Sequence, residues 1–209
     1  EAGKAGLLTH ILCTKETVPP CRDIPCTHVT RAILDKITGS VSGSDIAAIC
    51  RFPDRSDENA SRWILLDRIQ DPGNLGTIIR SAYAFGYDTI LLSEGCADPY
   101  NEKVIRSTQG ALFHLCIRSC SLPDAVNDLK QRGVPIYATA LHKDSIPLAQ
   151  LSVPDTFAVL FGNEGQGVSE ELLAMSDATL FIEMERFESL NVAVAAGITL
   201  YEMKQKRLP

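Results

Sequence analysis

Residues 187–197 read FESLNVAVAAG, a polar turn that runs into a series of small residues. Ser189 and Asn191 belong to the residue types that cap helices, because their side-chain oxygens accept hydrogen bonds from free backbone amides. The Ala and Gly residues that follow allow a helix to pack very close to other backbone. The stretch predicts a capped, buried helix over residues 191–206, and by itself it predicts nothing more.

Two earlier stretches also combine a turn with a regular element. Residues 71–80 read DPGNLGTIIR, and residues 161–167 read FGNEGQG. The Pro and Gly residues of the first predict a tight turn at the carboxyl end of a strand, where open α/β sheets place their sites. The three Gly residues of the second let the backbone approach a ligand, and Glu164 suits a ligand with hydroxyl or amine groups. Taken singly, each stretch also fits an ordinary surface connector.

Apolar strands alternate with helices from Trp63 onward. Continuous apolar strands in such an alternation are typical of a parallel sheet covered by helices on both faces, so the predicted fold class is α/β. Asn74 is expected to cap the first of these helices, and Gly86 to end it. The strands are predicted over residues 63–66, 88–92, 113–117, 136–139, 157–161 and 178–182, and the helices over residues 75–85, 102–108, 122–132, 169–175 and 191–206.

A smaller α/β piece precedes this alternation. Residues 46–50 are apolar and predict a buried strand. The polar run at residues 53–59 has no apolar periodicity and is typical of a linker. We therefore expect two domains, over residues 1–57 and 58–209.

The composition is that of an ordinary globular chain. The 209 residues are 45% hydrophobic and 22% charged, and no apolar run reaches the roughly 20 residues that a membrane helix needs. The net charge of −6 argues mildly against non-specific nucleic-acid binding, although a local basic patch can survive it.

The seven cysteines are scattered through apolar segments. Cys21 and Cys26 lack the CxxC spacing of a zinc site and have no His at a suitable offset. We interpret the cysteines as structural thiols in a reducing cytoplasm, and we expect no metal.

Taken together and in this order, the three stretches resemble the motifs of the SpoU/TrmH family of RNA ribose methyltransferases, which belongs to the SPOUT superfamily. The resemblance covers residues 62–203, and residues 98–111, DPYNEKVIRSTQGA, resemble the family's segment between its first two motifs. Residues 1–50 resemble the end of the family's amino-terminal RNA substrate-binding domain, which is similar to ribosomal protein L30e, with its first strand and helix missing.

This resemblance implies a fold, a cofactor and a reaction. It implies a carboxy-terminal trefoil knot, a feature almost absent from proteins, which would form a pocket for S-adenosyl-L-methionine. It implies a homodimer with active sites built across the interface, and methyl transfer to a ribose 2′-hydroxyl of rRNA or tRNA. We expect a cytoplasmic enzyme with no membrane partner, and the resemblance leaves the RNA and the nucleotide open.

The resemblance also implies roles for residues of this chain. Because a guanidinium stays protonated in proteins, we expect Arg80 to grip an RNA phosphate, with Asn74 holding it, rather than to act as a base. Ile182-Glu183-Met184 departs from the family's usual Ile-Pro-Met and is expected to put a carboxylate near the pocket. The catalytic candidates are Arg80, Asn74, Glu164, Ser189 and Asn191, and the cofactor-binding candidates are Gly162, Ile182, Leu190, Leu160 and Met184.

Two other functions compete with this interpretation. A non-catalytic knotted relative that only binds RNA is disfavoured, because the polar candidates at residues 74, 80, 164, 189 and 191 are all present. A nucleotide-binding oxidoreductase is suggested only by glycine turns, and the chain lacks GxGxxG followed by an acidic residue at the right distance.

Overall fold

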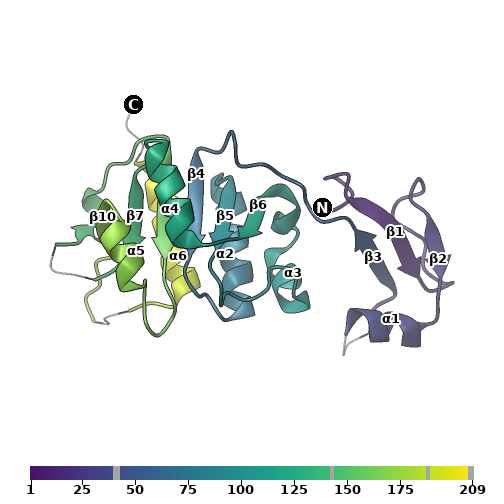
Figure 1. Ribbon diagram of the computed structural model, residues 1–209. Helices are drawn as coiled ribbons and strands as arrows, with labels where there is room; N and C mark the ends of the chain where they lie inside the picture. The colour runs from purple at the N-terminus through teal and green to yellow at the C-terminus, as the bar shows by residue number, and fades with distance from the viewer. Residues whose placement is uncertain (40–42, 142–143, 187–188, 207–209) are drawn as a thin grey trace. The chain divides into compact units, whose positions relative to one another are not determined.

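Two units divide the chain in the computed structural model, Glu1–Asp54 and Arg55–Pro209 (Figure 1). The structure describes residues 1–39, 43–141, 144–186 and 189–206. Each unit is built around its own sheet.

The larger unit contains a seven-stranded sheet in which every pair of neighbouring strands is parallel. Its strand order is β6-β5-β4-β9-β7-β10-β8. The parallel α/β sheet expected from the alternating apolar runs is thereby confirmed. The strands are β4 (Arg62–Leu66), β5 (Thr89–Leu92), β6 (Cys116–Ser119), β7 (Ile136–Thr139), β8 (Ile146–Pro147), β9 (Phe157–Phe161) and β10 (Ala178–Phe181).

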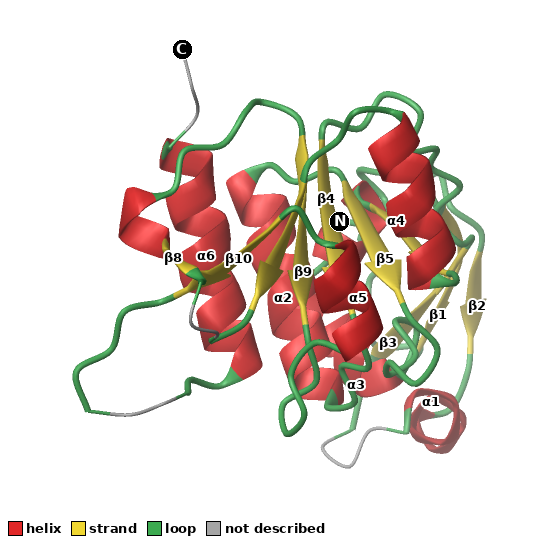
Figure 2. Ribbon diagram, turned by 60° about the vertical axis from the view of Figure 1, so that its left-hand side comes forward, coloured by secondary structure: helices red, strands yellow, loops and turns green. Residues whose placement is uncertain are grey.

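Helices cover both faces of this sheet (Figures 1 and 2). The residues buried on one face come from α2, α3 and α6, and those on the other face come from α4 and α5. The helices are α2 (Pro72–Phe85), α3 (Glu102–Thr108), α4 (Leu122–Gln131), α5 (Glu170–Met175) and α6 (Val192–Gln205), with short 3-10 turns at Ala111–His114 and Leu148–Gln150.

Strand alternation sends neighbouring residues into two separate cores. In β4, Ile64 and Leu66 pack with the α2 and α6 side, whereas Trp63 and Leu65 pack with the α4 and α5 side. All four are 1% exposed or less. Each such side chain stabilises the fold by about 1.5–3 kcal/mol through burial, so the central strands hold the unit together.

The strand order creates a switch point between β4 and β9. From β4 the chain continues to β5 on one side, and from β9 it continues through α5 to β10, on the other side. In open parallel sheets the crevice outside the carboxyl ends at such a point is where ligands bind. The turns that follow Leu66 and Phe161 lie at this edge, because these residues are register partners at the ends of their strands.

Two local predictions in this unit need correction. Helix α2 begins at Pro72 and is capped by Asp71 rather than Asn74, since the Asp71 carboxylate accepts a hydrogen bond from the Asn74 backbone amide. Gly86 ends the helix in the left-handed conformation, with φ 76°, as expected. The strand predicted over residues 113–117 begins only at Cys116, because the Phe113 amide bonds back to Gly110 in a 3-10 turn.

The smaller unit is a three-stranded sheet with one helix. Its order is β2-β1-β3, with β1 parallel to β2 and antiparallel to β3. The predicted strand at residues 46–50 forms, but it is not buried, since Ile49 is 49% exposed. The elements are β1 (Leu8–Cys13), β2 (Cys26–His28), α1 (Arg31–Thr38) and β3 (Ile46–Cys50).

Among the described residues, the structure contains no helix with the length and apolarity needed to cross a bilayer.

The cap of α2 yields a prediction on stability and its pH dependence. Asp71 Oδ1 accepts the Asn74 amide at 2.8 Å, and this bond is the largest cause that lowers the pKa of Asp71, with the charge of Lys103 adding to it. We expect Asp71→Ala to lower the free energy of unfolding by about 1 kcal/mol at neutral pH, and Asp71→Asn, which keeps the accepting oxygen, to cost far less.

The pH dependence follows from the direction of that shift. Because folding lowers the pKa, the ionised carboxylate stabilises the fold above its ordinary value of 3.8, and this contribution is lost as the pH falls through the folded-state pKa. Urea denaturation followed by the fluorescence of the single tryptophan, Trp63, measures both effects. A gap between wild type and Asp71→Ala that stayed constant into acid would contradict this account.

Candidate functional site

A cavity of about 340 Å³ opens at the carboxyl edge of the large sheet. Its walls come from the segments that follow β7, β9 and β10 and from the first turns of α6. The floor is apolar, with Phe161, Leu180 and Ala195 among its residues. This size and an apolar floor with polar groups at the rim are typical of a site for a small organic molecule.

Four of the five residues predicted to bind a cofactor line this cavity: Gly162, Ile182, Met184 and Leu190. The fifth, Leu160, does not. Its side chain is fully buried in the core on the α4 and α5 side, and Phe161 lines the cavity in its place. The reason is strand alternation, which sends consecutive side chains of β9 to opposite faces.

Gly162 is required by the loop in which it lies. A Cβ atom at this position would stand 2.0 Å from the Val168 nitrogen and 2.1 Å from the Gly167 carbonyl carbon. The approach is this close because the Asn163 and Gly167 backbones exchange two hydrogen bonds, at 3.0 and 2.9 Å. Glycine is therefore required at this position by the packing of the loop itself, whether or not a ligand binds.

Asn163 and Asp67 hold the two turns at the switch point, and sequence reasoning missed both. Asn163 donates to the Arg68 carbonyl oxygen at 2.9 Å and accepts the Gly165 amide at 2.9 Å. Asp67 is 4% exposed and accepts the Ser169 amide at 2.9 Å. For Asp67, the sequence did carry a signal: its carboxylate directly follows a buried apolar strand, where such a side chain is expected to find backbone donors.

A chain of side-chain hydrogen bonds joins all three motifs at the rim of the cavity. Asn74 donates to Glu164 Oε1 at 2.9 Å, and Asn191 donates to Asn74 Oδ1 at 3.0 Å. Asn191 also caps α6, since its Oδ1 accepts the Ala193 amide at 3.0 Å. Of the five predicted catalytic residues, Glu164 and Ser189 line the cavity, and Asn74 and Asn191 are linked to its lining through the hydrogen bond to Glu164.

Arg80 stands apart from this group. It is exposed on α2, and it forms no hydrogen bond or ion pair with the residues that the structure describes. It does not line the cavity. Within the described residues of one chain, the Asn74 amide group is bonded to Glu164 and Asn191 and not to Arg80.

Thr199 is a further cavity residue that the sequence did not reveal. It lines the cavity from α6, is 0% exposed, and its hydroxyl has no hydrogen-bond partner among the described residues. A buried hydroxyl without a partner costs free energy, so such groups mark places where a ligand or water completes the bonding. The only signal was a polar residue within an otherwise apolar helix.

Glu183 does not bring a carboxylate into the cavity. It is exposed, and it is absent from the lining although its neighbours Ile182 and Met184 belong to it. The departure from the family's usual proline therefore leaves the walls of the cavity apolar at this point. Phe187 and Glu188, at the start of the third motif, lie outside the described residues.

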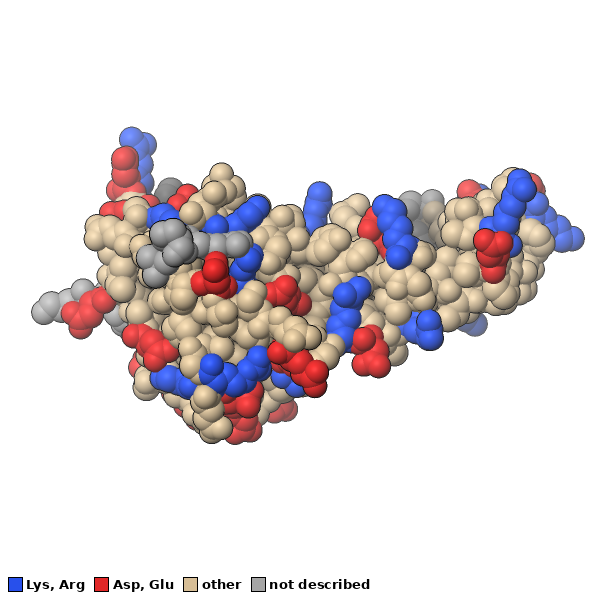
Figure 3. Space-filling model, turned by 90° about the horizontal axis from the view of Figure 1, so that it is seen from above, with Lys and Arg blue, Asp and Glu red and all other residues tan. Residues whose placement is uncertain are grey.

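Basic and acidic side chains are interspersed on the face that Figure 3 shows. This distribution agrees with the net charge of −6. Contacts with an anionic polymer on that face would rest on single basic residues rather than on a broad basic field.

Comparisons with known proteins place the chain among RNA-modifying enzymes. The model of the SpoU rRNA Methylase family matches residues 61–201. The 23S rRNA (guanosine(2553)-2′-O)-methyltransferase RlmP of Bacillus subtilis is 38% identical over 203 residues, which are 95% of this chain and 82% of that protein. The tRNA (guanosine(18)-2′-O)-methyltransferase of Thermus thermophilus is 36% identical over 149 residues, which are 69% of this chain and 75% of that protein.

A solved structure adds the fold. The AdoMet-bound rRNA methyltransferase of Sinorhizobium meliloti superposes with a TM-score of 0.83 at 28% identity, and the match covers 100% of this chain and 84% of that chain. A relative that carries AdoMet and covers the whole chain shows that a fold of this kind accommodates the cofactor.

The loop geometry predicts that Gly162 and Gly165 respond very differently to the same substitution. Gly162→Ala should lower the free energy of unfolding by about 3 kcal/mol or more, because its methyl group collides with backbone. Gly165→Ala should change it by no more than about 0.5 kcal/mol, since its methyl group would meet only Asn163 Oδ1 at 3.5 Å. Urea denaturation without any ligand measures both, and equal stabilities would show that the loop is not closed as described.

Proposed function

Since the chain belongs to the SpoU rRNA Methylase family, we propose that it is an S-adenosyl-L-methionine-dependent methyltransferase that modifies a ribose 2′-hydroxyl of RNA. The observation that carries the proposal is the meeting of the three motifs at one cavity, through the hydrogen bonds of Asn74 with Glu164 and Asn191. Ribosomal RNA of the large subunit is the substrate we favour, because the relative at 38% identity acts on 23S rRNA.

The cavity fits the cofactor in three respects. Its volume of about 340 Å³ suits a small organic molecule. The loop at Gly162 presents backbone without an intervening side chain, and the Thr199 hydroxyl has no hydrogen-bond partner in the described part of the chain. Gly162, Ile182, Met184 and Leu190 would hold the cofactor, together with Thr199. When bound, S-adenosylmethionine supplies a methyl group on a positively charged sulfur.

The polar side chains at the rim of the cavity supply the hydrogen-bonding groups that the reaction needs. With the cofactor held in the cavity, these groups would orient the ribose 2′-hydroxyl toward the methyl group and let the hydroxyl proton pass to solvent. Glu164 is fixed by Asn74, so its carboxylate is oriented to accept hydrogen bonds from hydroxyl or amine groups in the cavity. Holding the reacting groups in line is where such a site gains most of its rate. A non-catalytic role is disfavoured because this network is intact.

Arg80 is assigned to the RNA rather than to the cofactor. Its guanidinium is exposed, has no partner among the described residues and lies outside the cavity lining. A free guanidinium binds phosphate with two parallel charge-assisted hydrogen bonds. Gripping a phosphate next to the target ribose would orient the 2′-hydroxyl toward the cavity.

The outer surface of α6 supports a homodimer. Val194, Ile198 and Tyr201 follow one another at helical spacing and are 51%, 38% and 47% exposed. They form one exposed apolar stripe, and Phe85 of the neighbouring α2 packs edge-on against Tyr201. A second copy of the chain would cover this stripe around a two-fold axis. Arg80 lies on α2, outside the cavity of its own chain. In the dimer, the Arg80 of the second copy would lie at the cavity of the first.

Three further parts of the proposal come from the family alone. The carboxy-terminal segment is proposed to form the trefoil knot. The threading of the chain in such a knot would bring α6 and the loop after β9 together at the cavity. The unit Glu1–Asp54 is proposed to be part of an L30e-like domain that selects the RNA. The enzyme is proposed to work in the cytoplasm.

Thr199 gives a direct test of the cofactor site. Thr199→Val keeps the shape but removes the hydroxyl, so S-adenosylmethionine should bind about 3- to 10-fold more weakly, the equivalent of one hydrogen bond. The free energy of unfolding without ligand should not fall, because an unpartnered buried hydroxyl is removed. Isothermal titration calorimetry measures the affinity. Thr89→Val, at another fully buried threonine away from the cavity, is the matched control and should leave the affinity unchanged.

The shared active site can be tested by mixing two inactive variants. Arg80→Ala should abolish methylation of RNA while S-adenosylmethionine still binds. Ala195→Leu should fill the cavity and abolish binding, whereas Ala174→Leu, at an exposed alanine of α5, should leave binding unchanged. Co-refolded in equal amounts, the two inactive variants should regain about a quarter of wild-type activity, because half of the dimers are mixed and each has one intact site.

The measured quantity is transfer of a radiolabelled methyl group to rRNA. Mixtures as inactive as the single variants would show that Arg80 serves the cavity of its own chain. An active Arg80→Ala variant would remove Arg80 from the reaction altogether.

A further inference from the structure

The parallel pairing of β1 with β2 brings three metal-binding side chains to one face of the small sheet. Cys13 is the register partner of His28, and Ile11 is the partner of Cys26. Because side chains alternate along a strand, Cys26 and His28 project to the same face of β2. Register partners in neighbouring strands share a face, so Cys13 projects there as well.

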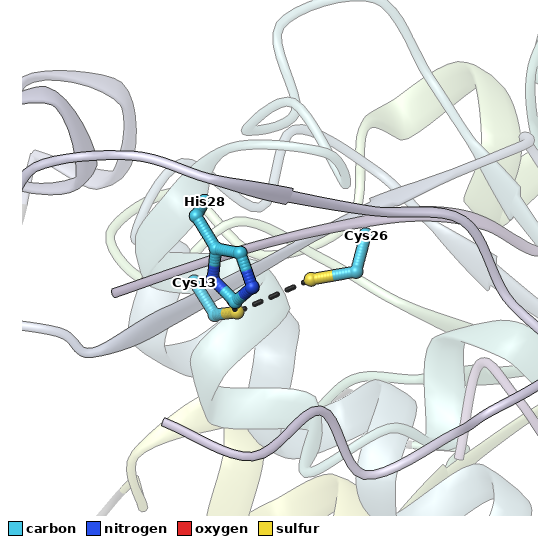
Figure 4. Close-up of side chains that lie close together, drawn as sticks. All are labelled: Cys13, Cys26 and His28. Carbon is cyan, nitrogen blue, oxygen red and sulfur yellow. Dashed lines mark hydrogen bonds between the residues drawn. The ribbon is translucent and has the colours of Figure 1, made fainter. Parts of the chain in front are cut away.

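The side-chain atoms confirm this convergence, which Figure 4 shows. Cys13 Sγ lies 3.2 Å from Cys26 Sγ and 3.5 Å from His28 Nδ1. All three donor atoms lie within 4.8 Å of one another. His28 is exposed whereas Cys13 is buried, so the cluster has a closed side and a side open to solvent.

We propose that Cys13, Cys26 and His28 bind a zinc ion, with a water molecule as the fourth ligand on the open side. Two thiolates and one imidazole are a donor set that zinc prefers. Zinc–sulfur bonds of about 2.3 Å and zinc–nitrogen bonds of about 2.0 Å give tetrahedral edges of roughly 3.7 Å between sulfurs and 3.5 Å between sulfur and nitrogen. The Cys13–His28 separation already matches, and the two sulfurs need to part by only about 0.5 Å.

Binding exchanges protons for the ion in a balanced way. The two thiols lose their protons to solvent. The imidazole of His28 stays neutral by losing its hydrogen from Nδ1 and gaining one at Nε2, which frees the lone pair of Nδ1 for the ion. Nδ1 also lies 3.3 Å from the Thr14 carbonyl oxygen, so without metal it donates its hydrogen to that group. Zinc binding needs no oxidant, whereas a disulfide bond between the same two sulfurs would need one.

The ion would stabilise the smaller unit, which buries few apolar side chains. Within the smaller unit, the buried hydrophobic residues among those described are Ile11, Cys13 and Leu34. Strand β2 is three residues long and lies at the edge of its sheet. A metal that ties β1 to both ends of β2 supplies the cross-link that small units with little apolar burial need.

This inference reverses the expectation that the chain has no metal site. Cys21 is the cysteine nearest to Cys26 in the sequence, whereas the structure brings Cys26 to Cys13 and His28. Cys21 is not part of the cluster. The spacing Cys26-x-His28 is short enough to notice, but its third ligand is 13 residues upstream on another strand.

The experiment is a titration of the whole chain, reduced and stripped of metal, with Co²⁺ and then Zn²⁺. We expect one Co²⁺ per chain with an intense thiolate-to-cobalt charge-transfer band, which Zn²⁺ displaces. Cys13→Ser, Cys26→Ser and His28→Ala should each weaken binding by about 100-fold or more. Circular dichroism confirms that each variant is folded, and His28, being exposed, can be replaced with little effect on packing.

Two matched controls lie in the same segment. Cys21→Ser removes a neighbouring thiol, and His10→Ala removes an imidazole that bonds Thr27, a β2 residue outside the cluster. Both should bind Co²⁺ as the wild type does. A wild-type chain that binds no Co²⁺ or Zn²⁺ at micromolar concentration, or a His28→Ala variant with unchanged affinity and spectrum, would overturn the proposal. Methyl transfer is not measured, so the result is independent of the proposed function.

Discussion

The amide group of Asn74 is the interaction on which the arrangement of the site depends. It donates to Glu164, 90 residues away in the chain, and accepts from Asn191, 117 residues away. Asn74 can reach both because Asp71 fixes the first turn of α2. Asn191 in turn fixes the start of α6. The two bonds of the Asn74 side chain fix the three turns relative to one another. The positions of the polar groups at the rim of the cavity follow from this arrangement.

At the loop after β9, the wall of the cavity is formed by backbone rather than by side chains. Gly162 lies so close to Gly167 and Val168 that no side chain fits, and Asn163 closes the loop with its own amide group. Asp67 then ties this loop to the turn after β4. The glycine loop thus makes these bonds without a ligand, which favours binding because less conformational freedom is lost on association.

The two units are stabilised by different means. The larger one has two apolar cores on opposite faces of a parallel sheet, where burial of strand and helix side chains dominates. The smaller one has little buried apolar surface in its described residues, and its distinguishing feature is the convergence of two thiols and an imidazole. A zinc ion there and a cofactor in the larger unit would be separate binding events, so each unit would respond to a ligand of its own.

The sequence by itself determined the alternation of strands and helices, the parallel sheet and the turns of the three motifs, because these depend on local patterns of apolar, capping and glycine residues. Only the tertiary structure decided that Phe161 rather than Leu160 faces the cavity and that Arg80 lies outside it. It also decided that the Thr199 hydroxyl finds no hydrogen-bond partner among the residues that the structure describes. It alone paired Cys13 with Cys26 and His28. The physical reason is that strand register and helix docking fix which side chains meet, and both are set by contacts between residues distant in the chain, which local periodicity does not encode.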